Sequence, residues 1–455
     1  MRELFRRLHK RYRIWYYTLR PTYALMVGYT FYVLVTFLLL CLPICRNVSD
    51  VPLIDTLFIA IAAISTAGLQ SVCIAETYNT IGQIVVLLGI QIGGLGYMTL
   101  GSFVILASKG HLPKNRLNIG KAVLAMPESF DPHRFFRHIA VFTLSIELIG
   151  AFILWLCFWH AGTPNPLWAA IFHSVAAFCT AGISIFPNNL ESFADNPAIC
   201  LTIAALSLLG GIGFIVMDDL YRSLKSKSLR TTLTTRIILV ATFGALLVGT
   251  AFLFFCPHIA ELPLKQRLLM AFFQTVSALT TSGFNTVPIN NLAGATIVIV
   301  IVLMTLGASP SGTGGGLKTT TWSAAIAAIT SFFRGKEEIT FFGSKVPQGR
   351  ITAAFASITL YMIAFVIGTY CLLLSDSHPF ERIVFEVASA LGTSGLSFGI
   401  TSELSTTGKI IVMLLMYIGR LGVVALALGA VALYHDILHE PAHTSPPVKE
   451  DDIVL

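Results

Sequence analysis

The sequence predicts an all-α polytopic membrane protein in which four helix–pore half-helix–helix repeats surround one central pore. Three observations support this fold class. Hydrophobic residues make up 55% of the 455 residues and charged residues only 12%, whereas a soluble domain carries about 25% charged residues. Apolar runs recur along the chain, most of them long enough to cross a bilayer, which takes about 20 residues in a helix. One short glycine pattern also occurs four times, with its glycines 114, 101 and 112 residues apart.

Each repeat is predicted to contain a long helix, a half-helix too short to span the membrane, a turn and a second apolar helix. The expected helices are 23–44, 53–65 and 81–107 in repeat 1 (residues 21–110), 139–160, 167–179 and 198–217 in repeat 2 (111–220), 237–256, 267–280 and 295–308 in repeat 3 (221–335), and 351–374, 380–392 and 409–434 in repeat 4 (336–436). A half-helix of this kind is stable only where its backbone is buried in protein or lines a wet cavity. Its C-terminal end faces the turn and favours a cation.

The four turns follow the half-helices and share the order small hydroxyl residue, small residue, glycine, bulky apolar residue. A glycine at the same place in every unit indicates peptide planes that point inward, which often requires a positive φ and a close approach of neighbouring turns. Because a ring of such carbonyl groups can replace the hydration shell of a cation, the sequence predicts an ion filter. The predicted filter residues are Thr66, Ala67, Gly68, Leu69, Thr180, Ala181, Gly182, Ile183, Thr281, Ser282, Gly283, Phe284, Thr393, Ser394, Gly395 and Leu396.

A second glycine motif follows each turn, at 93–96, 210–213, 307–310 and 419–422. In repeats 1 and 2 we interpret it as a hinge or a close helix contact. In repeat 3 the apolar run stops at Gly307 and a glycine-rich loop continues to Lys318, which is tolerable in mid-membrane only where the loop faces an aqueous pore. We therefore predict that the loop is a gate. It is not predicted to bind a nucleotide, because Leu317 stands where a phosphate loop needs glycine before the lysine.

In repeat 4 the second motif carries Arg420 within an otherwise uncharged run. A charge at that depth is costly unless it faces water or a partner, and a snorkelling or ion-paired structural arginine is the alternative interpretation. Alignment of the repeats instead places Arg420 beside the loop of repeat 3, whose carbonyls its five donors could bind. The predicted gate residues are Ser309, Ser311, Gly312, Thr313, Gly314, Gly315, Gly316, Lys318 and Arg420.

The distribution of basic residues predicts the orientation in the membrane. Most of the 30 Lys and Arg lie in the N-terminal segment 1–20 and in the loops 108–138, 218–236 and 334–350. The positive-inside rule places these segments and the C-terminal tail, 437–455, in the cytoplasm. The net charge of +7 then follows from topology, and no nucleic-acid partner is expected.

A few other polar residues fall within or beside the apolar runs. Glu147 is expected either to be paired or to act as a proton relay. His173, Gln274 and Glu386 lie on half-helices and are expected to form hydrogen bonds of the scaffold. The spacing of His435 and His439 suits a metal, but without the neighbouring glutamate it does not support a zinc site. A cation at the filter is the one metal ion expected.

With these motifs, residues 20–435 resemble the Trk/Ktr/HKT superfamily of potassium transporters. The resemblance rests on the four turns, the glycine-rich loop and Arg420 together. Trk-type members carry an extra helix pair before the first repeat, for which this chain is expected to have no room, so it is most similar to the bacterial KtrB membrane subunit. The resemblance implies a homodimer in the bacterial inner membrane, with one pore per subunit. It also implies docking, through the basic loops, on a cytoplasmic ring of KtrA/TrkA-like nucleotide-binding subunits, with no nucleotide on this chain.

The resemblance also bears on the transported ion. In this superfamily a serine in place of the first filter glycine goes with sodium preference, and here all four positions are glycine, which favours K⁺. A role for Na⁺ as activator or coupled ion stays open, as does a sodium-selective transporter of the same architecture. Two other classes of protein are disfavoured. An alternating-access secondary transporter would require paired repeats and buried midplane carboxylates, and an intramembrane enzyme would require a catalytic constellation that the sequence does not show.

Overall fold

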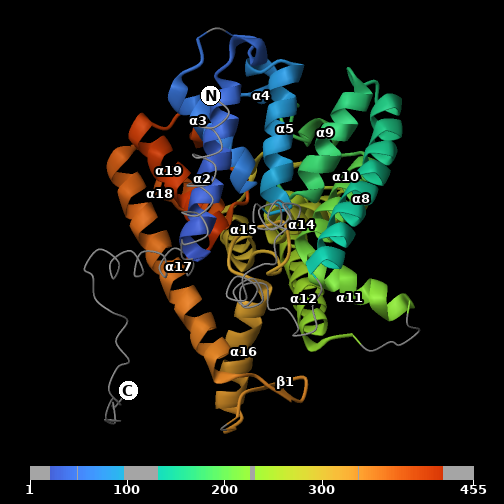
Figure 1. The fold of residues 1–455 in the computed structure, drawn as a ribbon, viewed down its shortest axis with the longest axis vertical. Helices are drawn as coiled ribbons and strands as arrows, with labels where there is room; N and C mark the ends of the chain where they lie inside the picture. The colour runs from blue at the N-terminus through green and yellow to red at the C-terminus, as the bar shows by residue number, and fades with distance from the viewer. Residues whose placement is uncertain (1–20, 49, 97–131, 226–230, 337, 424–455) are drawn as a thin grey trace, which may run out of the picture.

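The computed structural model describes residues 21–48, 50–96, 132–225, 231–336 and 338–423 (Figure 1). Within these ranges the chain is helical apart from loops and one hairpin of two short strands, β1 (Thr340–Phe341) and β2 (Ser344–Lys345). The predicted cytoplasmic N-terminus 1–20, most of the loop 108–138, the histidine pair at 435 and 439, and the tail 437–455 lie outside the described residues.

Each predicted repeat contains the three expected kinds of helix. They are α2 (Pro21–Leu40), α3 (Leu53–Ser65) and α5 (Thr80–Gly94) in repeat 1, α8 (Pro132–His160), α9 (Pro166–Phe178) and α10 (Pro197–Ile212) in repeat 2, α12 (Leu233–Phe254), α14 (Leu264–Leu279) and α15 (Gly294–Leu306) in repeat 3, and α17 (Gln348–Ser375), α18 (Phe380–Gly392) and α19 (Thr406–Leu421) in repeat 4. Two further helices, α11 (Phe214–Lys225) and α16 (Thr319–Phe333), follow the inner helices of repeats 2 and 3. Single turns complete the described chain: η1 (Pro43–Cys45), α4 (Ile74–Thr77), η2 (Glu191–Phe193), α13 (Pro257–Ala260), η3 (Ile289–Asn291) and η4 (Ile400–Ser402).

The half-helices α3, α9, α14 and α18 form the centre of the fold. Each packs between the first, outer helix and the last, inner helix of its own repeat and also against the inner helix of the preceding repeat: α5 on α9, α10 on α14, α15 on α18, and α19 on α3. The last of these contacts joins repeat 4 to repeat 1, so the four units close into a ring. Contact with three neighbouring helices explains how helices of 13 to 16 residues are stable here, since their C-terminal ends lie buried inside protein.

The outer helices carry the lipid-compatible surface. In the part of the chain that the structure describes, three helices are long and apolar enough to cross a membrane: His138–His160, Leu233–Phe254 and Gln348–Ser375. Their outward faces are apolar; Leu247 on α12, for example, is 74% exposed. A fourth candidate span is the pair Pro197–Ile212 and Phe214–Ser223, which is bent by 91°. The prediction of one continuous helix over 198–217 was therefore wrong.

The reason for that bend is Gly213, which has φ of +91°. A left-handed φ interrupts the hydrogen-bond ladder of a helix, and glycine adopts it without steric cost. The same device ends α15 at Gly307 (φ +65°) and α19 at Gly422 (φ +84°), and Gly96 follows α5 with φ of +79°. The expected uninterrupted helix over 409–434 is thus also wrong, because α19 stops at Leu421.

Candidate functional site

Each half-helix ends in the same turn. Its first residue is a threonine in a left-handed conformation, with φ of 50°, 50°, 56° and 50° at Thr66, Thr180, Thr281 and Thr393. The threonine N–H donates to the carbonyl three residues back, and the following N–H donates to the carbonyl five residues back, over 2.8 to 3.2 Å. This pair of bonds is the Schellman motif, in which glycine usually takes the left-handed position. A β-branched residue there is an outlier, and it occurs four times.

The four turns face one another around a common centre. The glycines Gly68, Gly182, Gly283 and Gly395 have φ between +60° and +88°, as the glycine pattern predicted. A Cβ added to one of them would lie 2.2 to 2.8 Å from the carbonyl oxygen of the residue that precedes the glycine of another turn, in the order repeat 1, 2, 3, 4 and back to 1. No side chain fits between these backbones. The residue after each glycine, Leu69, Ile183, Phe284 or Leu396, is buried and anchors its turn in the core.

The glycine-rich loop (307–318) lies directly against these turns. Thr313 Oγ1 is 3.1 Å from Thr180 Oγ1, and Thr66 Oγ1 donates to the Thr313 carbonyl over 3.4 Å. Gly315 N–H donates to Thr281 Oγ1 over 3.1 Å. A Cβ on Gly315 would stand 1.9 Å from Thr393 Oγ1. The loop therefore touches the threonine of every turn, which places it on the common centre of the four repeats.

Two basic side chains donate hydrogen bonds to carbonyls of the loop. Arg420 donates from Nη1 to the Thr313 carbonyl and from Nη2 to the Gly93 carbonyl of α5. Lys318 Nζ donates to the Gly314 carbonyl over 2.9 Å. The predicted contact between Arg420 and a loop carbonyl is therefore present, and the arginine also ties the loop to repeat 1.

The loop also caps the break between α10 and α11. The freed carbonyls of Gly210, Gly211 and Ile212 accept from Thr313 N–H, Ser309 N–H and Ser309 Oγ over 3.1, 3.0 and 2.6 Å. The first N–H groups of α11, at 214 and 215, donate to the carbonyl and Oγ of Ser311, each over 3.2 Å. The sequence alone did not predict this packing of the loop, because it did not place the bend at Gly213 beside the loop.

The second glycine motif is a close contact as well as a hinge. Gly93, Gly210 and Gly419 each lie over the last turn of a half-helix, where an added Cβ would approach the carbonyl of Ile64, Phe178 or Leu391 to within 2.2, 1.9 and 2.1 Å. Both interpretations offered for repeats 1 and 2 therefore apply.

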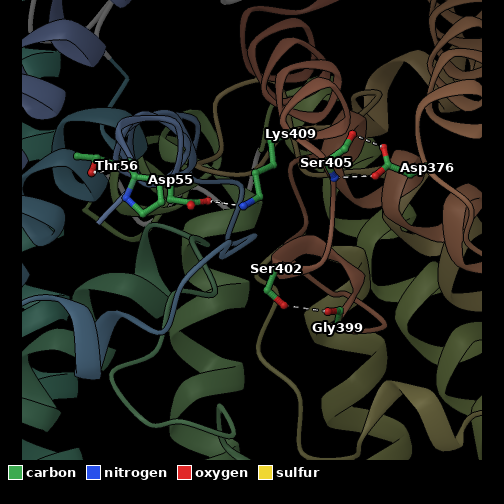
Figure 2. A network of polar contacts seen from close by, with 8 residues as sticks. Asp55, Thr56, Asp376, Gly399, Ser402, Ser405 and Lys409 are labelled. Carbon is green, nitrogen blue, oxygen red and sulfur yellow. Dashed lines mark hydrogen bonds and ion pairs between the residues drawn. The ribbon is translucent and has the colours of Figure 1, made fainter. Parts of the chain in front are cut away.

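A buried ion pair on the other side of the turns was not predicted. Lys409, in the first turn of α19, reaches Asp55 in the first turn of α3, with Nζ and Oδ1 2.6 Å apart and the two side chains 11% and 7% exposed (Figure 2). The pair joins repeat 4 to repeat 1. In the sequence, an aspartate near the start of one apolar helix and a lysine near the start of another could have suggested a pair. Only the packing of α19 on α3 shows that these two residues meet.

The same end of α19 is held by Asp376, the residue after α17. Its carboxylate accepts from the N–H and Oγ of Ser405 over 2.6 and 3.0 Å (Figure 2). Burial raises the pKa of Asp376, but hydrogen bonds from Ser375 and Ser405 outweigh burial, and the pKa lies below its usual range. This contact therefore stabilises the fold above the ordinary aspartate pKa and is lost as the pH falls through the lowered value.

Replacing Asp55 with asparagine is expected to destabilise the protein by about 3 to 5 kcal/mol, because the buried Lys409 would lose its counter-charge. The double variant Asp55→Asn/Lys409→Met should recover most of that loss, since neither position then carries a charge. Thermal unfolding of the purified protein in detergent measures both effects. Lys265→Met, at an exposed lysine, is the matched control. An Asp55→Asn protein as stable as the parent would show that the pair contributes nothing.

The remaining polar residues have varied surroundings. Glu147 of α8 is buried and accepts from Gln91 Nε2 over 3.1 Å, so it is paired with a neutral amide. His173 and Glu386 form hydrogen bonds of the scaffold, as expected, whereas Gln274 has no partner for either amide atom. Among the described residues, no group of three or more His, Cys, Asp and Glu could hold a metal ion.

Comparison with known proteins gives consistent matches. The family model "TrkH: Cation transport protein" matches residues 29–437. "Ktr system potassium uptake protein B" of Vibrio alginolyticus is 33% identical over 395 residues, covering 86% of each chain. The protein of the same name from Bacillus subtilis is 32% identical over 409 residues, 88% of this chain and 91% of the relative. The crystal structure of the potassium transporter TrkH from Vibrio parahaemolyticus has a similar fold, with a TM-score of 0.73 at 19% identity over 90% of this chain and 85% of that one.

Proposed function

The chain belongs to the TrkH family of cation transport proteins, and from this premise we propose that it is the potassium-translocating membrane subunit of a Ktr-type uptake system. As a family member it is a multi-pass membrane protein and a cation transporter, not an enzyme. The observation that carries the proposal is the closed ring of four glycine turns with a backbone loop directly against it. Backbone carbonyls in a ring of this kind are the ligands that take the place of water around K⁺.

In this proposal the four turns are the filter. The negative ends of α3, α9, α14 and α18 point at it, which favours a cation at the centre. Because the residue at all four positions is glycine, no side chain enters the space between the carbonyl groups of the four turns. This favours K⁺ as the transported ion over the alternative of a sodium-selective or Na⁺-coupled transporter.

The loop 307–318 and Arg420 are proposed to form the gate. The loop contacts all four threonines of the filter, and its backbone is held by Arg420 and Lys318. Ions could not pass the centre of the four repeats without a displacement of this loop. The closed arrangement therefore depends on a small number of hydrogen bonds to backbone carbonyls.

A potassium uptake assay tests the proposal. The chain is expressed, with a KtrA-like subunit, in a bacterium that lacks its own potassium uptake systems. Growth at low K⁺ and uptake of Rb⁺ as a tracer are expected, with Na⁺ competing weakly. Strong competition by Na⁺ would favour the sodium-selective alternative. Accumulation that is abolished by dissipating an ion gradient, with no channel-like flux in liposomes, would favour an alternating-access transporter.

Regulation is proposed to come from a cytoplasmic ring of KtrA/TrkA-like subunits that bind a homodimer of this chain, with both termini in the cytoplasm. The basic surface available for docking includes α11, which lies toward the same end of the molecule as the β1–β2 hairpin and opposite α4 (Figure 1). On α11, Arg222 is 62% exposed and pairs with Asp218 over 2.7 Å. Lys225 is exposed as well.

Charge reversal at this surface is expected to weaken docking. The variant Arg222→Glu/Lys225→Glu/Lys227→Glu, in which Lys227 lies outside the described residues, should lower co-purification with a KtrA-like ring at least tenfold, because like charges would then face an acidic partner. Lys265→Glu is the matched control, because it reverses an exposed lysine in the first turn of α14, on the non-cytoplasmic side by the charge prediction. Undiminished co-purification would remove α11 from the docking surface.

A further inference from the structure

Polar residues behind the four glycine turns follow a common register. The residue nine positions before each turn glycine lies on the half-helix. The residue two positions after the same glycine begins the segment that leaves the turn. In repeats 1 to 4 the first position is Ile59, His173, Gln274 and Glu386, and the second is Gln70, Ser184, Asn285 and Ser397. Only repeats 2 and 4 have serine at the second position.

In repeat 2 the histidine holds the serine. His173 Nδ1 donates to the Ala169 carbonyl over 2.7 Å, which leaves Nε2 to accept from the Ser184 hydroxyl over 2.9 Å. Ser184 Oγ in turn accepts from Phe186 N–H over 3.0 Å. The imidazole is fully buried and stacks on the Phe186 ring, with centroids 4.5 Å apart.

In repeat 4 the glutamate plays the same part. Ser397 Oγ donates to Glu386 Oε2 over 2.8 Å and accepts from Gly399 N–H over 2.9 Å. Thr401 donates to the other carboxylate oxygen. Glu386 is fully buried. The serine therefore makes the same two bonds as in repeat 2, one to the half-helix and one to the N–H two residues further on.

Repeats 1 and 3 lack this connection. The side chain of Ile59 has no polar atom, and both amide atoms of the Gln274 side chain are buried without a hydrogen-bond partner. The side chain of Asn285 turns away to Glu191 and the Val287 carbonyl, over 2.7 and 3.1 Å. Because the turns follow one another around the ring in chain order, repeats 2 and 4 face each other across the centre.

We propose that His173 and Glu386 are positioning residues that clamp the outgoing ends of two opposite glycine turns and thereby help to set the preference of the filter for K⁺ over Na⁺. The proposal rests on the potassium transport proposed above. A serine fixed two residues after the glycine limits how far the glycine carbonyl can move inward. Discrimination against the smaller Na⁺ requires that carbonyls do not close around it freely. The clamps act along one diagonal of the ring, and the other diagonal has none.

Alanine at the two serines tests the clamps with the least disturbance. Ser184→Ala and Ser397→Ala each remove one hydroxyl and one bond to the half-helix, and each is expected to lower the K⁺ over Na⁺ preference about fivefold. Ser184→Thr and Ser397→Thr keep the hydroxyl and should keep the preference. The matched control is Gln274→Leu, at the register position of repeat 3 that makes no bond, and it should leave the preference unchanged.

The readout is the half-inhibiting concentration of Na⁺ divided by that of K⁺ for Rb⁺ uptake, measured at equal amounts of inserted protein with the unfolding temperature recorded for each variant. A lowered ratio in both alanine variants, with parent-like stability, supports the clamps. A parent-like ratio in both, or an equal loss in Gln274→Leu, overturns them. The unmodified chain is measured alongside, and absence of Rb⁺ uptake by it would refute the proposed transport itself, a result distinct from a failure of the clamps.

Discussion

Replacement of Arg420 with alanine is expected to raise potassium flux and to make it less dependent on a regulatory subunit. The arginine binds the carbonyls of Thr313 and Gly93, so its loss frees the loop from α5. A hydrogen bond from a charged group contributes about 1.5 to 3 kcal/mol, so the ratio of closed to open protein should fall about tenfold to a hundredfold. Deletion of Thr313–Gly315, which contact the turn threonines, should act in the same direction.

Lysine at position 420 should restore the barrier only in part, because an ammonium group keeps the charge but lacks the planar fork that binds two carbonyls at once. Rb⁺ flux into liposomes, with and without a KtrA-like ring, measures these effects. Arg382→Ala, at an arginine near the Phe398 ring and outside the loop contacts, controls for loss of a basic residue. Flux that falls in both gate variants, in correctly inserted protein, would mean that these residues build the pathway and do not close it.

Replacement of Gly68 with serine is expected to lower the preference for K⁺ over Na⁺ at least tenfold while the protein still inserts. The new Cβ would lie 2.6 Å from the Ala181 carbonyl oxygen and 2.9 Å from the Gly395 Cα, so both neighbouring turns must shift. The φ of +74° adds strain for any residue with a side chain.

A second glycine separates these two causes. Gly343, between β1 and β2, has φ of +76°, and a Cβ there would meet nothing within 4 Å. Gly343→Ser therefore carries the backbone strain without the collision and should keep the parent selectivity in a Rb⁺ flux assay with K⁺ and Na⁺ as competitors. If Gly68→Ser also keeps it, the assignment of the first filter turn is wrong.

Much of this architecture could be predicted because it repeats. The half-helices at 53–65 and 380–392 coincide with α3 and α18, and the other two differ by at most three residues. The break at Gly307 and the contact of Arg420 with the loop also followed from alignment of the repeats. Fourfold repetition turns a weak local pattern into a strong one, since the same backbone demand is met at four independent sites.

The features that could not be predicted depend on pairing between distant segments. Asp55 and Lys409 are 354 positions apart, and their contact follows from ring closure and not from any local pattern. The bend at Gly213 was missed because an apolar run reads the same whether it is straight or broken by one glycine. The left-handed threonines were missed because β-branched residues rarely adopt that conformation.

Hydrogen bonds join the loop 307–318 to the joint of α10 and α11. Movement of the loop is therefore coupled to movement of this joint, although the two lie about 100 residues apart in the sequence. If the loop leaves its place, three carbonyls of α10 and two N–H groups of α11 lose their partners, and each unpaired buried group costs about 1 to 3 kcal/mol. The loop therefore cannot open alone: water must enter the joint, or α11 must change its angle. By thermodynamic reciprocity, a partner whose binding favours another angle of α11 also favours displacement of the loop, by the same coupling free energy. A change in the angle of α11 would in this way change the position of the loop at the centre of the four repeats.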